Sequence, residues 1–239
     1  MFGFFLCKKQ WIFLKMSDYF ELMFECLPDL MAGLGATLLV AIASMFFAFI
    51  IGMVLALMGL SNSIYLRSIY HSYVAFIRGV PVLIFALFLF FGVGGILNIQ
   101  FNPIVAGIIT LSINASAFLA EIFRGGIMAV DKGQVEASRS LGFGYFRTMR
   151  YIVLPQALRI MVPPIINQFI STLKDTSILS VISVRELTMN SQIIIARNFR
   201  PFEVYSYTAI IYFIVILIIA LFAKVIEKKL NSASKNRSN

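Results

Sequence analysis

The sequence predicts an all-α, polytopic membrane protein with five membrane-spanning helices. Of the 239 residues, 60% are hydrophobic and only 13% are charged, whereas a soluble domain is roughly half apolar and about a quarter charged. Because a soluble globule needs charged side chains over its outer surface, this composition indicates that most of the surface faces lipid. The apolar runs are too long for barrel strands, which alternate polar and apolar residues over about ten positions, so the spans are expected to be helices.

Gaps between charged residues locate the first three spans. No charge falls between Asp29 and Arg67, and a spanning helix needs about 20 apolar residues, so the first span lies here. The uncharged stretch Gly79–Ala120 is long enough for two more spans. Within it, the segment from Gly92 to Pro103 contains the glycines, asparagine and proline typical of a turn, which predicts a helical hairpin.

Two further spans lie in the second half of the chain. Ile160–Leu173 is too short alone, but Tyr151–Pro155 extends it if the Arg159 side chain reaches toward the membrane interface. The last run, Val204–Ala223, is rich in isoleucine and aromatic residues and stops at a group of lysines. The predicted spans are residues 34–60, 72–93, 103–128, 151–174 and 203–224.

The distribution of Lys and Arg orients these spans. Much of the formal net charge of +9 lies in the segment Lys132–Arg159 and in the tail from Lys224, and the positive-inside rule places both in the cytoplasm. The amino terminus is then external. The segment Phe2–Phe24 is interrupted by charges, which favours an interfacial helix and leaves a sixth crossing as the alternative. The predicted parts are an external or interfacial segment (1–30), a transmembrane domain (31–229) and a cytoplasmic tail (230–239).

The polar stretch Asp131–Arg150 is the longest one that cannot lie in lipid. Residues 133–142 are expected to form a short helix closed by Gly142, since glycine readily adopts the left-handed conformation that ends a helix. Arg139, Arg147 and Arg150 would bind acidic partners or lipid head groups. Composition alone favours the alternative, an ordinary basic cytoplasmic loop.

A spacing within this stretch favours a more specific interpretation. Glu136-Ala137-Ser138, a glycine at 142 and Ile152-Val-Leu154-Pro155 together resemble the E-A-A-x3-G-x9-I-x-L-P loop of ABC importer permeases. The resemblance implies a cytoplasmic coupling helix that docks into a cleft of a separate ATPase subunit. Ser138 departs from the usual second alanine by a small-for-small change. The coupling residues that the resemblance implies are Glu136, Ala137, Ser138, Arg139, Gly142, Leu154 and Pro155.

The resemblance extends over nearly the whole chain and narrows to the polar amino acid uptake family of the histidine, arginine and glutamine type. Phe76–Pro81 is similar to the F-x-R-G-T-P segment of that family, Ala120–Ile127 to its A-E-x-x-R-G-G-I segment, and Leu173–Ser177 to its L-K-D-T-S segment. The resemblance implies the type I ABC importer permease fold in the cell membrane, acting as a dimer and by default a homodimer. It also implies two ATPase subunits that hold ATP and magnesium, an external solute-binding protein, and no cofactor on this chain.

Ionisable residues at membrane depth are candidate substrate ligands, because each costs roughly 2.5 to 3.5 kcal/mol in lipid on insertion scales and must face protein or water. Asp175 lies among hydroxyl side chains at an expected helix break, where it would receive the ammonium group of an amino acid while backbone N–H groups take the carboxylate. Pro163-Pro164 before it would kink the span. The candidate substrate-binding residues are Asp175, Lys174, Thr172, Thr176, Ser177, Glu121, Asn114 and Ser116.

These candidates have structural alternatives. Glu121 would pair with Arg124 one helical turn further on, and Lys174 would extend toward the interface. The polar residues of the third span would instead hold two helices together. Two acids at membrane depth, Glu121 and Asp175, slightly favour a basic substrate such as arginine, histidine or lysine, although permeases for neutral and acidic substrates share both segments.

Other classes of function have less support. The chain has no G-x-x-x-x-G-K-[ST] motif, so ATP is expected on another chain. An enzyme is disfavoured and no catalytic or metal-binding residue is expected, because His71 is the single histidine and Cys7 and Cys26 lack metal-ligand spacing. The alternative is a secondary amino acid transporter or channel without an ATPase, which would explain the intramembrane charges but not the cytoplasmic motif. The positive charge sets topology, so nucleic acid is not an expected partner.

Overall fold

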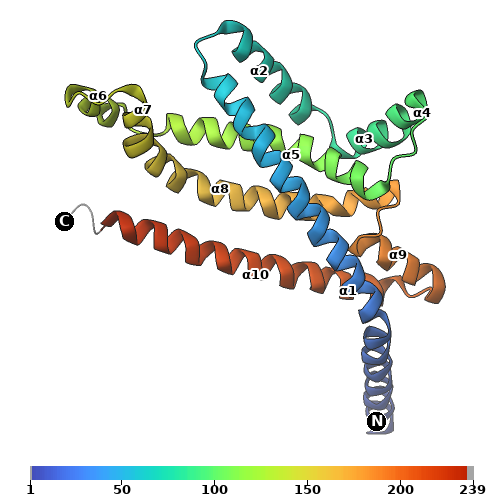
Figure 1. The fold of residues 1–239 in the computed structure, drawn as a ribbon. Helices are drawn as coiled ribbons and strands as arrows, with labels where there is room; N and C mark the ends of the chain where they lie inside the picture. The colour runs from blue at the N-terminus through green and yellow to red at the C-terminus, as the bar shows by residue number, and fades with distance from the viewer. Residues whose placement is uncertain (1, 236–239) are drawn as a thin grey trace.

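A computed structural model describes the backbone of residues 2–235 and the side chains of residues 18–229. Within these residues the elements are helices (Figure 1). In chain order they are α1 (Phe2–Leu60), α2 (Ile64–Gly79), α3 (Val82–Leu87), the π-helical turn η1 (Phe88–Val93), α4 (Gly94–Leu97), α5 (Pro103–Met128), α6 (Lys132–Ser140), α7 (Tyr145–Thr148), the π-helical turn η2 (Met149–Val153), α8 (Leu154–Asp175), the 3₁₀-helix η3 (Thr176–Ile182), α9 (Leu187–Asn198) and α10 (Pro201–Lys235).

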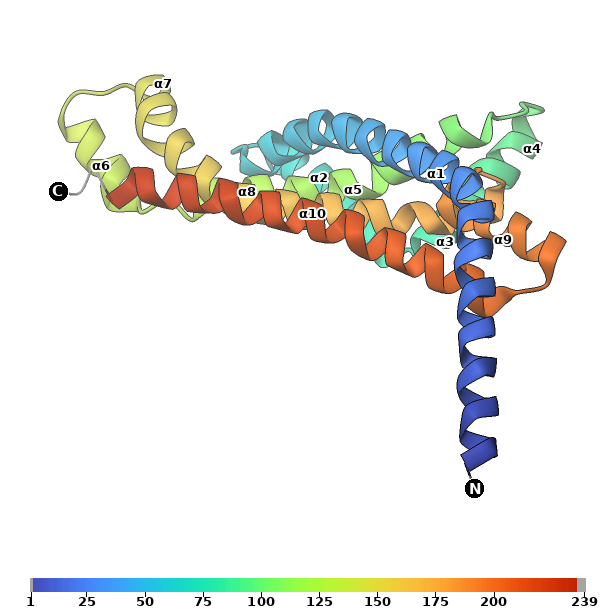
Figure 2. The ribbon, with the colours of Figure 1, turned by 90° about the horizontal axis from the view of Figure 1, so that it is seen from below.

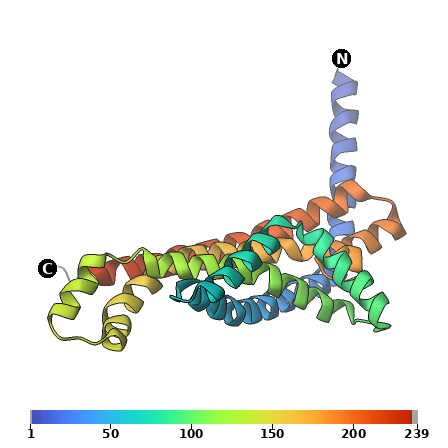
Figure 3. The same cartoon turned by 90° about the horizontal axis from the view of Figure 1, so that it is seen from above.

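The four longest helices, α1, α5, α8 and α10, form the body of the molecule. Helix α5 packs against α1 and α8, and α10 packs against α8 and α9. The α6–α7 segment lies at one end of this body together with the end of α10, whereas α4 and α9 lie at the other end (Figure 1 and Figure 3). The first part of α1 projects away from the body near α9 (Figure 2). The polar loop and the carboxyl-terminal helix end are therefore on the same end of the molecule.

The helices are long and apolar enough to cross a membrane. Three of the described helices can do so individually, namely Asp18–Leu60, Pro103–Met128 and Pro201–Lys229. Two bent pairs pass the same test when each pair is taken as one span, namely Ile64–Gly79 with Val82–Leu97 and Tyr145–Ile182 with Leu187–Asn198. The described residues thus supply up to five spans, in agreement with the predicted all-α, five-span architecture.

The span predicted over residues 72–93 contains a break. Val80 is extended, with φ −101° and ψ 129°, because the ring of Pro81 clashes with a helical backbone at the residue before it. The two halves of the pair bend by 100° at this point. The predicted span gave no sign of this bend, since a gap between charges shows how long the chain can stay in lipid but not whether it stays straight.

The turn after this broken helix comes later than predicted. Helical structure continues through Gly92–Gly95, and the chain reverses from Asn98, which is left-handed with φ 52°. Asn102 then caps α5 by accepting a hydrogen bond from the N–H of Ile104 at 2.9 Å, and Pro103 has no N–H that needs a partner. Glycine weakens a helix without ending it, so the glycine cluster was a poor marker of the turn.

The backbone of α8 changes at Asp175 and not at its prolines. Helix α8 runs through Pro163 and Pro164 without interruption, so no break is found at these two residues. The α-helix ends at Asp175, and Thr176–Ile182 continue as the 3₁₀-helix η3. A 3₁₀ segment is a common ending of an α-helix. Asp175 therefore lies at a junction of two helix types, where the sequence predicted a break.

Helix α1 approaches α5 closely at Gly52. A Cβ atom at this position would lie 2.9 Å from Leu119 Cβ and 3.1 Å from the carbonyl oxygen of Ser116, so the approach requires glycine. Small residues are typical of contacts between membrane helices, where close packing replaces the hydrophobic effect as the main attraction. The contact fixes α5, which carries Asn114, relative to α1.

A buried carboxylate joins α9 to the body. The Glu186 side chain is fully buried, and it caps α9 by accepting hydrogen bonds from the N–H groups of the first helical turn at 2.8 and 2.7 Å. Tyr212 of α10 donates a third hydrogen bond at 3.0 Å. The N–H of Leu187 donates to the hydroxyl of Thr37 in α1 at 3.1 Å. Helices α1, α9 and α10 therefore meet at one hydrogen-bonded junction.

Gly52→Ala should lower the thermal unfolding temperature of the detergent-purified protein, because the added methyl group forces α1 and α5 apart at a cost of about 1–3 kcal/mol. Gly35→Ala is the matched control on the same helix, since no atom lies within 4 Å of a Cβ placed there. The measurement is the unfolding temperature of both variants beside the wild type, and equal shifts for the two would contradict the packing argument.

Candidate functional site

A cleft of about 300 Å³ opens between α2, α3, α5 and α8. Two charged side chains of opposite sign line it, Arg78 at the end of α2 and Asp175 at the end of α8, together with two amides and a hydroxyl. The residues that line this cleft are Ile77, Arg78, Val80, Val82, Asn114, Phe118, Gln168, Ser171 and Asp175. The bend at Pro81 brings residues from both sides of the break into its wall. The cleft can therefore hold a small molecule that carries both charges.

A second cleft of about 430 Å³ adjoins the first, since Arg78, Phe118 and Gln168 line both. It continues along α5 and α8 past Glu121 and Pro164. Together the two clefts form a groove with Asp175 in one part and Glu121 in the other.

The predicted substrate ligands are only partly brought together. Asp175 and Asn114 line the first cleft, and Glu121 lines the second. Lys174 is exposed and does not line either cleft, and Ser177 donates its hydroxyl to the Lys174 carbonyl at 2.7 Å.

The other hydroxyl residues of the prediction are buried. Thr172 accepts a hydrogen bond from the Gln168 amide at 3.3 Å, and Thr176 donates to the Leu173 carbonyl at 2.8 Å. Ser116 is buried between helices, 2.8 Å from the hydroxyl of Tyr73 in α2. These contacts correspond to the helix-packing alternative for Ser116.

Three polar residues of the cleft, Arg78, Gln168 and Ser171, were missed by the prediction. A signal for two of them was present in the sequence, because residues spaced by three and four positions share a helix face. Gln168, Ser171 and Asp175 have this spacing. Arg78 is far from Asp175 in the chain and joins the cleft only through the packing of α2 on α5.

The Glu121 carboxylate belongs to a polar cluster between α2 and α5. Arg124 lies 3.5 Å from its Oε1 through Nε, and Arg78 lies 3.7 Å from its Oε2 through Nη1. The fully buried Tyr70 donates its hydroxyl to Glu121 and accepts a hydrogen bond from Arg124 Nε at 3.0 Å. The ion pair between Glu121 and Arg124, which was the structural alternative predicted from the sequence, is present. Tyr70 and Arg78 join it.

The polar loop forms the short helix α6 at one end of the molecule (Figure 1). Asp131 caps its start by accepting a hydrogen bond from the N–H of Gly133 at 2.6 Å. At its end Gly142 has φ +78°, its N–H bonds to the Arg139 carbonyl at 2.9 Å, and the next N–H bonds to the Ser138 carbonyl at 3.0 Å. This is the Schellman arrangement, so the predicted role of Gly142 in ending the helix is confirmed.

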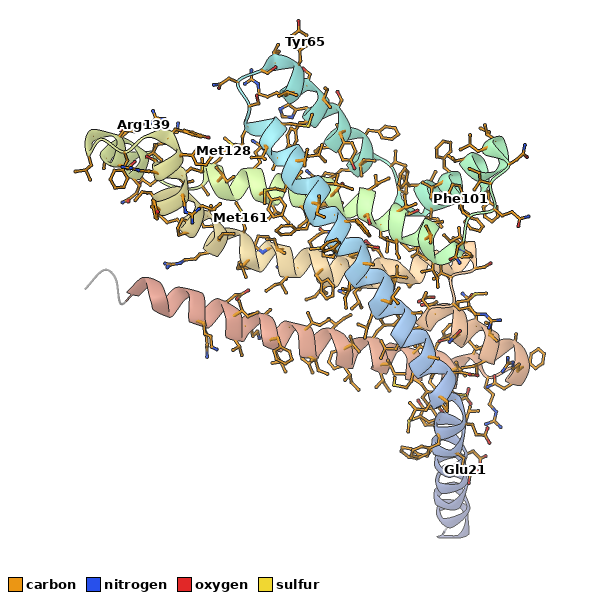
Figure 4. The ribbon with its side chains drawn as sticks, viewed as in Figure 1. Glu21, Tyr65, Phe101, Met128, Arg139 and Met161 are labelled. Atoms are coloured by element: carbon orange, nitrogen blue, oxygen red, sulfur yellow. The ribbon has the colours of Figure 1, made fainter. Side chains whose placement is uncertain are left out.

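The predicted coupling residues divide into an outward and an inward group. Glu136, Ala137, Arg139 and Leu154 are exposed, and Pro155 is half-buried; Arg139 is seen on the projecting segment in Figure 4. Ser138 instead faces inward, where its hydroxyl lies 2.9 Å from that of Thr148. It thereby holds α6 against α7.

Apolar and cationic side chains are both exposed on this loop. Leu141, Tyr145 and Phe146 are exposed at 78%, 66% and 85%, and Arg139 and Arg147 are exposed beside them. Exposed apolar side chains gathered on one surface mark a contact with another protein or a membrane. The arrangement is suited to contact with an acidic partner.

A helical membrane body with a polar cleft, joined to an exposed helix at one end, has the organisation of a transport protein that works with a partner. The chain belongs to the family of binding-protein-dependent transport system inner membrane components, whose family model matches residues 48–232. It is the permease subunit of an amino acid ABC importer, a membrane component that is not itself an enzyme. The resemblance read from the sequence is confirmed.

Two curated relatives illustrate the similarity. The probable amino-acid ABC transporter permease protein YckA of Bacillus subtilis is 40% identical over 209 residues, which are 87% of this chain and 92% of that protein. The glutamine transport system permease protein GlnP of Escherichia coli is 33% identical over 209 residues, 87% of this chain and 95% of that one.

Solved structures agree with the fold. A structure described as an amino acid ABC transporter with histidines is 35% identical, with a TM-score of 0.82 over 91% of this chain and 98% of that chain. The inward facing MetNI methionine ABC transporter, at 20% identity, has a TM-score of 0.70 over 84% and 95%, which supports the fold alone.

Tyr70→Phe should lower the unfolding temperature of the purified protein, because the lost hydroxyl leaves Glu121 and Arg124 short of a buried partner at a cost of about 1–3 kcal/mol. Tyr65→Phe on the same helix is the control, since Tyr65 is 80% exposed. The check is calorimetry or fluorescence unfolding in detergent, and a Tyr70→Phe protein as stable as Tyr65→Phe would argue against a structural role for the cluster.

Proposed function

We propose that this chain carries a polar amino acid across the cell membrane in a transporter driven by two copies of a separate ATPase subunit, which hold ATP and magnesium. The observation that carries the proposal is the exposed helix α6, capped at both ends and presented at one end of the molecule, with exposed apolar and cationic side chains on the α6–α7 segment. A rigid helix of this kind can transmit movement from a docked partner to α8, which follows it in the chain. In this proposal the α6 end is cytoplasmic and the amino terminus is external.

The proposed assembly also contains a second permease subunit, by default another copy of this chain, and an external solute-binding protein. The family description as a component of binding-protein-dependent transport supports the latter. Residues 1–30 are proposed to lie outside or at the interface, and residues 230–239 to form a cytoplasmic tail.

The proposed substrate is a polar amino acid, held in the cleft between Arg78 and Asp175. The slight preference for a basic substrate depended on two acids at membrane depth. Glu121 is paired with Arg124 and Arg78, so Asp175 is the acid that remains to support it. The relatives include permeases named for glutamine and for L-cystine, neither of which is basic.

The alternative of a secondary transporter or channel leaves the surface of α6–α7 without a partner. Co-purification separates the two proposals: the tagged permease should bring down an ATPase with a P-loop motif and hydrolyse ATP as a complex. Amino acid uptake that persists in vesicles without ATP or any ATPase subunit would favour the alternative.

Glu136→Arg combined with Gly142→Asp should abolish uptake and remove its coupling to ATP hydrolysis. The first change reverses an exposed charge on α6, and the second places a side chain at a left-handed position. Uptake and ATPase activity are measured in proteoliposomes, with Glu227→Arg as a charge-reversal control outside α6. Normal coupled uptake in the double variant would refute docking at α6.

Asp175→Asn should weaken the apparent affinity for the transported amino acid by about 10-fold or more, since a hydrogen bond to a charged group contributes about 1.5–3 kcal/mol and 1.4 kcal/mol is a factor of ten. The readout is substrate stimulation of the ATPase, with basal activity as the measure of intact assembly. Asp18→Asn removes an exposed carboxylate outside the cleft and should change nothing. Unaltered stimulation in Asp175→Asn would exclude this residue as a ligand.

A further inference from the structure

We propose that the cleft selects a neutral amino acid in its zwitterionic form, with Arg78 as the ligand of the α-carboxylate and Asp175 as the ligand of the α-ammonium group. The amides of Asn114 and Gln168 then face an uncharged polar side chain. This inference rests on the proposed function and deepens it, because it names the substrate class and assigns a binding role to Arg78.

The charge balance of the cleft supports a neutral substrate. One cation and one anion stand among the residues that line it, and the others are amides, a hydroxyl and apolar groups. The Glu121 carboxylate nearby is already engaged by Tyr70, Arg124 and Arg78. A substrate with a positively charged side chain would bring a second cation close to Arg78 with Asp175 as the sole compensating anion. A zwitterion with an uncharged side chain matches the two charges without excess.

The Arg78 guanidinium is held in place by its neighbours but still has unused hydrogen-bond donors. Its guanidinium lies over the Phe118 ring at 5.2 Å from the centroid, a favourable cation–π arrangement. Its Nη1 is 3.7 Å from Glu121 Oε2, which is longer than a hydrogen bond. A guanidinium has five N–H donors in a planar fork that suits a carboxylate, and among the described residues none of those of Arg78 is used in a hydrogen bond. The side chain is 45% exposed, so its donors can reach the cleft.

Asp175 is the charged group of opposite sign among the residues that line the cleft. It is half-buried at the end of α8, and within the described residues its carboxylate has no ion pair or hydrogen-bond partner. A carboxylate in such a position is costly unless something charged or polar meets it. An ammonium group supplies both the charge and the donors. Two ligands of opposite sign also fix which end of the substrate each of them binds.

The volume agrees with this class of ligand. A cleft of about 300 Å³ is at the small end of the range for small-molecule sites. Such a cleft suits a single amino acid and excludes a peptide. The apolar residues Ile77, Val80, Val82 and Phe118 provide walls that do not compete for the polar groups of the substrate.

The first experiment tests Arg78 with a pair of ligands that differ by the carboxylate. Equilibrium binding to the purified permease–ATPase complex is measured without the solute-binding protein. Any preference between the two ligands then comes from the permease and not from the binding protein. The probes are L-glutamine and 4-aminobutanamide, its decarboxylated analogue. The wild type should bind glutamine about 10- to 100-fold more tightly than the amine, the contribution of a charge-assisted hydrogen bond.

Arg78→Gln should weaken glutamine binding by about 10- to 100-fold and leave the affinity for the amine nearly unchanged, which removes the discrimination. Arg78→Lys, which keeps the charge but loses the fork, should fall between the two. Arg67→Gln removes an exposed arginine from the same helix outside the cleft and should behave as the wild type. Because the result is a ratio of two affinities, a general loss of folded protein does not produce it.

The second experiment tests the charge balance. Asn114→Asp and Gln168→Glu each add one negative charge to the cleft without changing its volume, and should shift the preference from L-glutamine toward L-arginine by about tenfold or more. The assignment of a neutral substrate would be overturned if the wild type bound L-arginine or L-lysine more tightly than L-glutamine and more tightly than every other neutral amino acid tested.

The outcomes separate this inference from the proposed function. If the wild-type complex drives amino acid uptake with ATP but Arg78→Gln still discriminates against the decarboxylated amine, the role of Arg78 is refuted and the transport function stands. If the wild type, assembled with its ATPase and binding protein, moves no amino acid on addition of ATP, the proposed function itself fails.

Discussion

The buried carboxylate of Glu186 is the constraint on which the arrangement of the carboxyl-terminal half depends. A carboxylate out of water is costly unless hydrogen bonds occupy its oxygens, and here two backbone N–H groups and the Tyr212 hydroxyl do so. These donors come together only when α9 begins at residue 187 and α10 packs beside it. Helix α9 then contacts η3, and η3 continues α8 from the point where Asp175 lies. The cleft thus depends on a junction that is not part of it.

The ionisable residues of the body have two different uses. Glu121 is surrounded by Tyr70, Arg78 and Arg124, so its charge serves to hold α2 against α5. Asp175 has no such partner among the described side chains and faces the cleft. Arg78 belongs to both groups, since it touches Glu121 weakly and lines the cleft. The structural cluster therefore places the arginine that the substrate would meet.

The sequence predicted the fold class correctly, and two of its candidate ligands, Asp175 and Asn114, line the cleft. Long uncharged runs indicated helices in a membrane, and the helix junction at Asp175 was expected from its polar neighbours. The bend at Val80 was missed, although the proline after it was visible, because a charge gap carries no information about direction. Buried Thr172 and Thr176 were expected to bind substrate, but hydroxyls next to a carboxylate can equally well bond to their own helix, as these do.

By itself the sequence determined which segments can lie in lipid and which need water, and which motif lies in the polar loop. These properties depend on residues close together in the chain, so spacing and composition are enough to define them. Only the tertiary structure decided which charges meet. The pairing of Glu121 with Tyr70 and Arg78, and the presence of Arg78 and Asp175 in one cleft, bring together residues far apart in sequence. Such contacts depend on how α2, α5 and α8 pack, and no local pattern records that geometry.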